Sequence, residues 1–169
     1  MFRVPEDDAL HPVRFYERCL AFEEHAHLAQ FEPEVAFLFR TEEKVKQGRR
    51  ILGTCYLPSV QGELRPMFDW LLQDKLGYLP TFLIVLEDEW WKEASDRERE
   101  ILMFHEMLHA DIARDRYGTP RFDRATGDPV WAIRGHDIEE FNEVVARYGA
   151  WSSDIERFLE AARQGAANN

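Results

Sequence analysis

The sequence predicts an α+β protein, in which a small sheet of about three to four strands, mixed or mostly antiparallel, packs on a long central helix and further helices. Residues 35–40 and 81–86 are short apolar runs typical of strands, and the second lacks polar alternation, as expected of a strand buried on both faces. Residues 95–117 contain neither Pro nor Gly and repeat apolar residues at helical spacing. With 169 residues and 45% hydrophobic content, residues 1–169 are expected to fold as a single domain.

The first third of the chain is expected to form one helix and two strands. Pro12 can occupy the first turn of a helix that continues to about Gln30, before a Pro-containing break. The strand at 35–40 is followed by a charged connection and a second strand at 50–57, which we expect to be antiparallel to the first. Gly53 in this second strand indicates a bulge or a close approach of another group to the backbone.

The middle of the chain is expected to add a helix and the buried strand. Residues 64–76 carry apolar side chains at helical spacing, and we expect these side chains to belong to the core. The buried strand at 81–86 leads into a turn and a short helical piece at 87–93. Trp90 and Trp91 in this piece are expected to cover the core near the next helix.

The long helix begins with a recognisable start signal. Ser95 and Glu98 have the spacing of a capping box, in which each side chain bonds the backbone N–H of the other residue. Acidic residues are concentrated in the first turns, while Arg114 and Arg116 lie near the expected end, as the helix dipole prefers. We expect the helix to continue without interruption until Gly118.

The stretch His105-Glu106-Met-Leu-His109 lies within this helix. At 3.6 residues per turn, positions four apart lie on the same side of a helix, so both imidazoles can bind one metal ion. Glu106 is rotated away from them and can instead reach a water on the metal and take its proton. The HExxH pattern is typical of two zinc ligands and the general base of a metal-dependent peptidase.

The remaining residues are expected to form a loop and two helices. Residues 119–129 contain Gly, Pro and Asp without a regular period, which predicts a loop that could bend over the metal cleft. Residues 130–134 are expected to be extended. Helices are expected at 138–148 and 153–162, and residues 163–169 are expected to form a frayed tail.

A catalytic zinc site needs a third protein ligand besides the two motif histidines. The longer pattern H-E-x-x-H-x-x-G-x-x-H is not met, because Ile112 stands in place of its Gly and Asp115 in place of its last His. The candidates are therefore His136, which is the one histidine further along the chain, and a glutamate of the following helix, Glu139 or Glu140. We expect His136 to bind the metal, with Glu140 as the main alternative.

The other histidines and the cysteines show no sign of a second metal site. His25 and His27 are two apart on an expected helix and face nearly opposite ways, so they are poor joint ligands. Cys19 and Cys55 are isolated, and the absence of any C-x-x-C pair excludes a cysteine zinc ribbon.

The sequence resembles the putative phage metallopeptidases, a family found in phage genomes and prophages, and more distantly the SprT-like metalloproteases. The resemblance rests on the segments Trp90-Trp91, His105-Glu-Met-Leu-His109, Gly-His136-Asp-Ile-Glu-Glu140-Phe and Arg-Tyr-Gly149-Ala-Trp151. It covers the C-terminal half well and the N-terminal half in outline. The resemblance implies a zincin-like fold, zinc peptidase activity and His136 as the third ligand. SprT-like proteases usually carry a cysteine zinc ribbon or a basic DNA-binding segment, and this sequence has neither.

Composition narrows the expected partners. A net charge of −11 and a pI near 5.0 disfavour electrostatic binding to nucleic acid or to anionic lipid. The longest wholly apolar run, Phe82 to Leu86, is too short to span a membrane, and no apolar signal segment follows the N-terminus. We expect a soluble protein of the cytoplasm, that of the host cell if a phage encodes it, with a peptide or protein as its substrate.

These observations together predict a zinc-dependent peptidase. His105, His109 and His136 would bind Zn²⁺, and Glu106 would be the general base as water attacks a peptide carbonyl. Candidates for a further donor to the oxyanion are Tyr117, Tyr148 and Arg134. The alternative is a catalytically silent, zinc-stabilised binding or structural protein of the same fold, whose site is closed by a fourth ligand such as Glu140 or Asp137.

Overall fold

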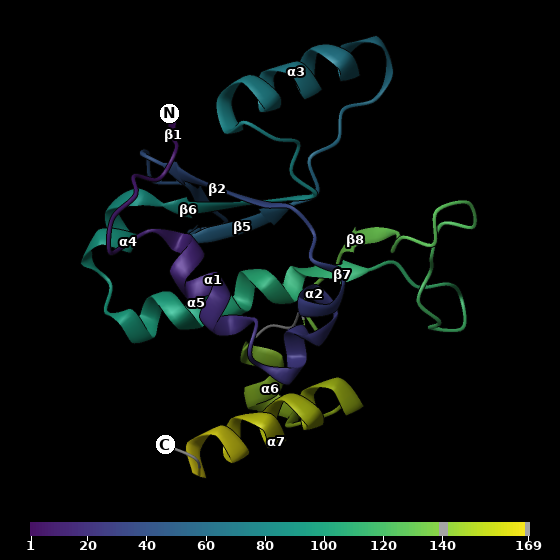
Figure 1. Ribbon diagram of the computed structural model, residues 1–169. Coiled ribbons are helices and arrows are strands. Elements are labelled where there is room, and N and C mark those ends of the chain that lie inside the picture. The colour runs from purple at the N-terminus through teal and green to yellow at the C-terminus, as the bar shows by residue number, and fades with distance from the viewer. Residues whose placement is uncertain (139–141, 168–169) are drawn as a thin grey trace. The chain divides into compact units, whose positions relative to one another are not determined.

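The computed structural model describes residues 1–138 and 142–167. The chain forms two compact units, Met1–Arg134 and Gly135–Asn169 (Figure 1). The first unit contains the sheet and the helix that carries the HExxH motif, and the second contains two helices.

A four-stranded sheet in the order β1-β2-β6-β5 lies at the centre of the first unit. Its strands are β1 (Phe2–Arg3), β2 (Val35–Arg40), β6 (Phe82–Glu87) and β5 (Gly53–Tyr56). β2 and β6 are parallel, with Val35 opposite Phe82, whereas β1 and β5 are antiparallel to their neighbours. The predicted α+β class with a small mixed sheet is confirmed.

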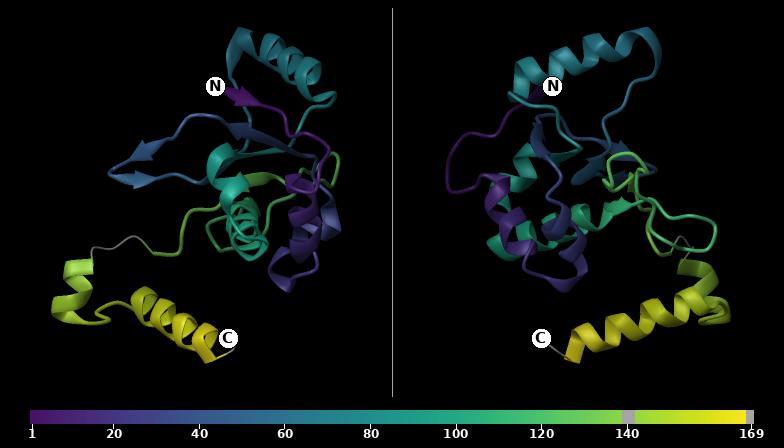
Figure 2. Two further views of the ribbon diagram at one scale, coloured as in Figure 1. Left: turned by 90° about the vertical axis from the view of Figure 1, so that its left-hand side faces the viewer. Right: turned by 45° about the vertical axis from the view of Figure 1, so that its right-hand side comes forward.

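The second predicted strand does not lie beside the first one. Its residues divide between β5 and a short hairpin, β3 (Val45–Lys46) and β4 (Arg49–Arg50), which projects from the unit (Figure 2, left). β5 pairs with β6 and not with β2. It still runs antiparallel to β2, because β2 and β6 are parallel. β2 and β6 are the two inner strands, and β6 has apolar residues on both faces, which only an inner strand can bury.

Helix α5 (Asp96–His109) packs on one face of the sheet, next to α1 (Pro12–Cys19) (Figure 1). The predicted capping box is confirmed: the backbone N–H of Ser95 donates to the Glu98 carboxylate at 2.8 Å, and the N–H of Glu98 donates to Ser95 Oγ at 3.3 Å. On the face toward the sheet, Met103 and Met107 are fully buried. The core between α5, α1 and the sheet therefore holds the motif helix in place.

The prediction that this helix continues to Gly118 is wrong, because α5 ends at His109. The next residues form β7 (Ala110–Ile112), which pairs antiparallel with β8 (Trp131–Ile133). Ala110 already has extended dihedral angles, φ −82° and ψ 99°. Pairing with β8 satisfies the backbone groups of β7 as well as further helical turns would, and it depends on a segment distant in the sequence.

The predicted helix from Pro12 to about Gln30 is interrupted. It consists of α1, the 3₁₀ turn η1 (Glu23–His25) and α2 (Ala26–Phe31). Phe22 between the first two is extended, with φ −81° and ψ 143°. Helical spacing of apolar residues identified the region, but the extended residue lets the chain turn so that α1 contacts α5 and α2 contacts β7.

Helix α3 (Arg65–Leu76) confirms the expected helix at 64–76 but not its expected burial. None of its residues, all of which the structure describes, is buried, and Trp70 is 62% exposed. The helix connects β5 to β6 and stands on the side of the sheet opposite α5 (Figure 1). Its periodicity indicated an apolar face and could not show whether anything covers that face.

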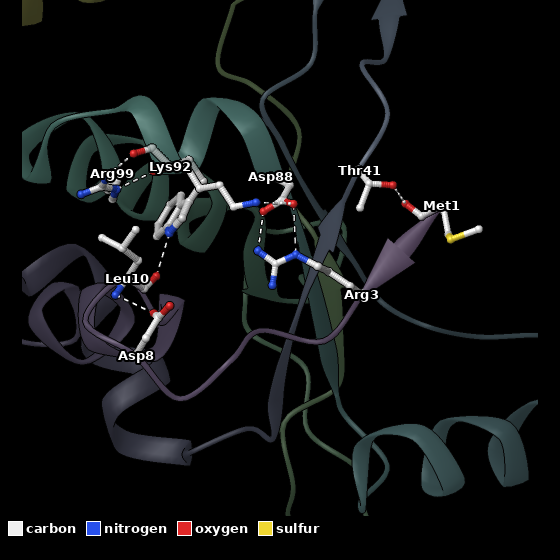
Figure 3. A network of polar contacts seen from close by, with 9 residues as sticks. Met1, Arg3, Asp8, Leu10, Thr41, Asp88, Lys92 and Arg99 are labelled. Carbon is white, nitrogen blue, oxygen red and sulfur yellow. Dashed lines mark hydrogen bonds and ion pairs between the residues drawn. The ribbon is translucent and has the colours of Figure 1, made fainter.

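Polar contacts attach the N-terminal segment to helix α4 (Asp88–Glu93) (Figure 3). The Arg3 guanidinium donates to both carboxylate oxygens of Asp88. The indole N–H of Trp91 donates to the carbonyl oxygen of Leu10 at 2.8 Å, and the Trp91 side chain is 1% exposed. The expectation that Trp91 covers the core is confirmed.

The second unit contains α6 (Asn142–Tyr148) and α7 (Ser153–Ala167). α6 corresponds to the predicted helix at 138–148, of which residues 139–141 lie outside the described residues. α7 is longer than the predicted helix at 153–162 and includes residues 163–167 of the expected tail. None of the helices in residues 1–138 and 142–167 has both the length and the apolar composition needed to cross a membrane.

Candidate metal centre

His105 and His109 lie one turn apart on the same side of α5. Their ring centroids are 5.1 Å apart, and the ring planes are inclined at 81° to each other. His105 is exposed and His109 is half-buried. Because α5 ends at His109, the second imidazole sits at the junction of the helix with β7, where a strand as well as a helix can orient it.

The backbone of Arg134 orients the His109 ring. His109 Nδ1 lies 2.6 Å from the carbonyl oxygen of Arg134, and the N–H of Arg134 donates to the carbonyl oxygen of His109 at 2.8 Å. A carbonyl oxygen can only accept, so the proton of this hydrogen bond belongs to Nδ1. In this tautomer Nε2 is the nitrogen with which the ring can bind a metal, which is a common arrangement for a ligating histidine.

His136 follows Arg134 by two residues, so the pairing of β7 with β8 also restricts where His136 can lie. One ring nitrogen from each of His105, His109 and His136 lies within 4.8 Å of the others. The structure thus brings together the three histidines proposed as ligands.

The chemistry of this donor set fits a transition-metal ion. Three neutral imidazoles and one open position are a common set for catalytic zinc, with ligand nitrogens about 3.3 Å apart in a tetrahedral site. In the structure the three nitrogens lie within 4.8 Å of one another, and the rings of His105 and His136 are exposed. The His105/His109/His136 cluster can therefore hold a metal ion.

The side chain of Glu106 is buried. It is 3% exposed, and its Oε2 has no hydrogen-bond partner within the described part of the chain. Burial raises the pKa of its carboxyl to about 7, and hydrogen bonding with the backbone N–H of Cys55 opposes the shift. A carboxyl group that titrates near neutrality can both accept and release a proton, as a general base must.

The alternative ligands cannot be compared with His136, because Glu139 and Glu140 lie outside the described residues. Asp137 is described and is exposed next to His136. Of the candidate oxyanion donors, Tyr117 is 76% exposed in the loop after β7, where its ring lies under the Arg116 guanidinium at 4.6 Å. Tyr148 belongs to α6 and is 69% exposed.

The loop between β7 and β8 does not fold back along α5. It extends beyond the C-terminal end of the helix (Figure 1) and is braced by isolated bridges from Arg114 to Pro120 and from Phe122 to Pro129. The sequence expectation of a loop bending over the metal cleft is therefore not supported by its course.

His25 and His27 lie outside the metal site, as expected. His25 is fully buried, with its ring 4.7 Å from that of Phe104, and desolvation lowers its pKa to about 4. His27 Nε2 donates to the carbonyl oxygen of Ala110 at 2.7 Å, since that oxygen can only accept. His27 thus supports the backbone directly after the motif, whereas His25 packs against an aromatic ring of the motif helix.

The sequence model of one family, described as putative phage metallopeptidase, matches residues 13–163. No curated protein and no solved structure matches the chain.

Proposed function

The chain belongs to the family of putative phage metallopeptidases, and on that premise we propose that it is a zinc-dependent peptidase encoded by a phage or prophage. The family description indicates a metal-dependent peptidase. The finer proposal rests on three imidazole nitrogens that lie within 4.8 Å of one another and on a buried glutamate, Glu106, that follows His105 in the chain.

His105, His109 and His136 would hold the ion, each through one ring nitrogen. Zinc fits because imidazole nitrogen is among its preferred donors and three protein ligands leave a position open for catalysis. When bound, the ion would polarise the substrate carbonyl and make water a stronger nucleophile at neutral pH.

Glu106 would act as the general base. It would receive the proton of the attacking water and pass it to the amine that leaves when the peptide bond breaks. Its burial supports this role, because a carboxyl group whose pKa lies near 7 can reverse its protonation within one catalytic cycle. A structural zinc site would not need a base at this position.

The test combines metal analysis with a peptidase assay. Wild type is expected to bind one zinc per chain and to cleave unstructured protein substrates such as casein. His105→Ala and His136→Ala should lose the metal, whereas Glu140→Ala should keep it. Glu106→Gln should keep the metal and lose at least about 100-fold in kcat.

Other outcomes would redirect the proposal. Zinc that is kept by His136→Ala but lost by Glu140→Ala would move the third ligand to Glu140. Zinc binding without cleavage of any substrate by wild type would favour the silent, zinc-stabilised binding protein. A fully active Glu106→Gln variant would remove Glu106 from the mechanism.

A further inference from the structure

Strand β5 approaches the Glu106 side chain closely at Gly53. Gly53 is paired with Leu86 of β6 at the start of this edge strand. A Cβ atom at Gly53 would lie 2.4 Å from Oε1 of Glu106, 2.7 Å from its Cδ and 2.8 Å from its Cγ. Non-bonded heavy atoms do not approach so closely, so the Glu106 side chain occupies the space in which a side chain at position 53 would begin.

The backbone at Gly53 does not itself require glycine. Its φ lies outside the left-handed region, so an L-residue could adopt the same conformation. The other glycines differ in the space around them, and most of them also differ in φ. None of them would bring a Cβ within 4 Å of another group, and six have positive φ: Gly48, Gly62, Gly77, Gly118, Gly127 and Gly149. Gly53 is therefore the glycine at which a neighbouring side chain, and not the backbone conformation, leaves no room for a larger residue.

The same strand also supplies a hydrogen bond to the carboxylate. Hydrogen bonding links Glu106 to the backbone N–H of Cys55, which lies two residues after Gly53 and so on the same side of β5. Glu106 is 3% exposed between the strand and its own helix. β5 thus provides both the room for the carboxylate and a donor that orients it.

We propose that Gly53 is a positioning residue for Glu106, because its missing side chain lets the carboxylate lie against β5 beside the motif histidines. The catalytic consequence rests on the proposed function, in which Glu106 is the general base. A larger residue at position 53 would push the carboxylate away from Cys55 and out of line with the water that it must deprotonate. The three heavy atoms nearest to a Cβ at position 53 all belong to Glu106, so the histidines would keep their places.

Gly53→Ala tests this directly, since one methyl group is the smallest change that fills the space. A displacement of about 1 Å in a catalytic group can cost roughly 100-fold in rate. The expected result is a fall in kcat of about that size, with KM within about threefold of wild type and one zinc per chain retained. Gly165→Ala is the matched control, because a Cβ there meets nothing and its φ is not positive. It should behave as wild type.

A double-mutant cycle tests the contact without reference to activity. In the presence of Glu106, Gly53→Ala should lower Tm by roughly 3 to 9 °C, because the new methyl group overpacks the site. In a Glu106→Ala background the same substitution should leave Tm unchanged or raise it, because the carboxylate is gone and alanine restricts the unfolded chain. If Gly53→Ala fails to fold alone, recovery of folding in the double variant gives the same answer.

Two results would overturn the proposal: an equal fall in Tm in both backgrounds, or a Gly53→Ala enzyme with kcat within twofold of wild type. Failure of the proposed function has a different signature. A wild-type protein with no zinc and no hydrolysis would refute the peptidase assignment. The cycle would still decide whether Gly53 accommodates Glu106.

Discussion

His109 and Arg134 are joined once through their backbones and once through the histidine ring, although 24 residues separate them along the chain. His109 ends α5, and Arg134 directly follows β8. The β7–β8 pairing therefore extends one residue further, to the proposed metal ligand. The orientation of the second imidazole depends on this pairing as much as on the helix.

Breaking the β7–β8 pairing should weaken metal binding without removing a ligand. Ala132 is opposite Asp111 in the middle of the pair, and proline at that position has no N–H to donate to a ladder. Ala132→Pro should lower zinc affinity by about 10- to 100-fold, the usual cost of losing a group that orients a ligand. Competition with a chelator of known affinity measures this. Ala132→Ser, which keeps the N–H, should bind zinc as wild type does, and equal affinity of both variants would contradict the prediction.

Removing the helix cap should lower stability and leave the site intact. Ser95→Ala loses the hydrogen bond that satisfies the N–H of Glu98 and the reciprocal arrangement with the Glu98 carboxylate. The expected cost is about 1 kcal/mol in the free energy of unfolding. Urea denaturation measures it, with the exposed Ser59→Ala as the control. An unchanged midpoint for Ser95→Ala would show that the core alone holds this end of α5.

The contact of Arg3 with Asp88 should make stability depend on pH in the acid range. Hydrogen bonding from Arg3, reinforced by Lys92, holds the pKa of the Asp88 carboxyl below its ordinary value of 3.8. A carboxyl group with a lowered folded-state pKa stabilises the protein above its unfolded-state pKa, and the contribution is lost as the pH falls below that value. At pH 7, Asp88→Asn should lose roughly 1 to 3 kcal/mol.

The difference between Asp88→Asn and wild type should shrink progressively as the pH falls from about 5 through 3.8. Denaturation curves across this range measure it. The neighbouring Glu89, which is exposed, supplies the control Glu89→Gln with the same change of charge. A stability difference for Asp88→Asn that does not vary with pH would mean that the ion pair is not its source.

Truncation of two tryptophans should affect the free energy of unfolding to very different extents. Trp91 is 1% exposed and donates to the carbonyl oxygen of Leu10, whereas Trp70 on α3 is 62% exposed. Trp91→Ala should cost about 3 to 5 kcal/mol, and Trp70→Ala should stay within about 0.5 kcal/mol of wild type. Thermal or chemical unfolding of the two variants measures this. A large loss for Trp70→Ala would show that α3 is covered in solution.

Features that depend on neighbouring residues could be predicted from the sequence. The strands at 35–40 and 82–87, the capping box of Ser95 and Glu98, and the common side of His105 and His109 follow from side-chain periodicity and from hydrogen bonds between residues a few positions apart. The family resemblance likewise rests on short segments, and it is confirmed by the match over residues 13–163.

Features that depend on a distant partner were decided by the tertiary structure. α5 ends at His109 because the residues that follow it pair with β8. β6 lies between β2 and β5, where its apolar residues on both faces are buried. The burial of Glu106 required a strand with no side chain at Gly53, and the sequence indicated a close approach there without indicating to what. Helical periodicity fixes which side a residue faces, whereas the neighbour on that side is set by chain segments that fold against it from far along the sequence.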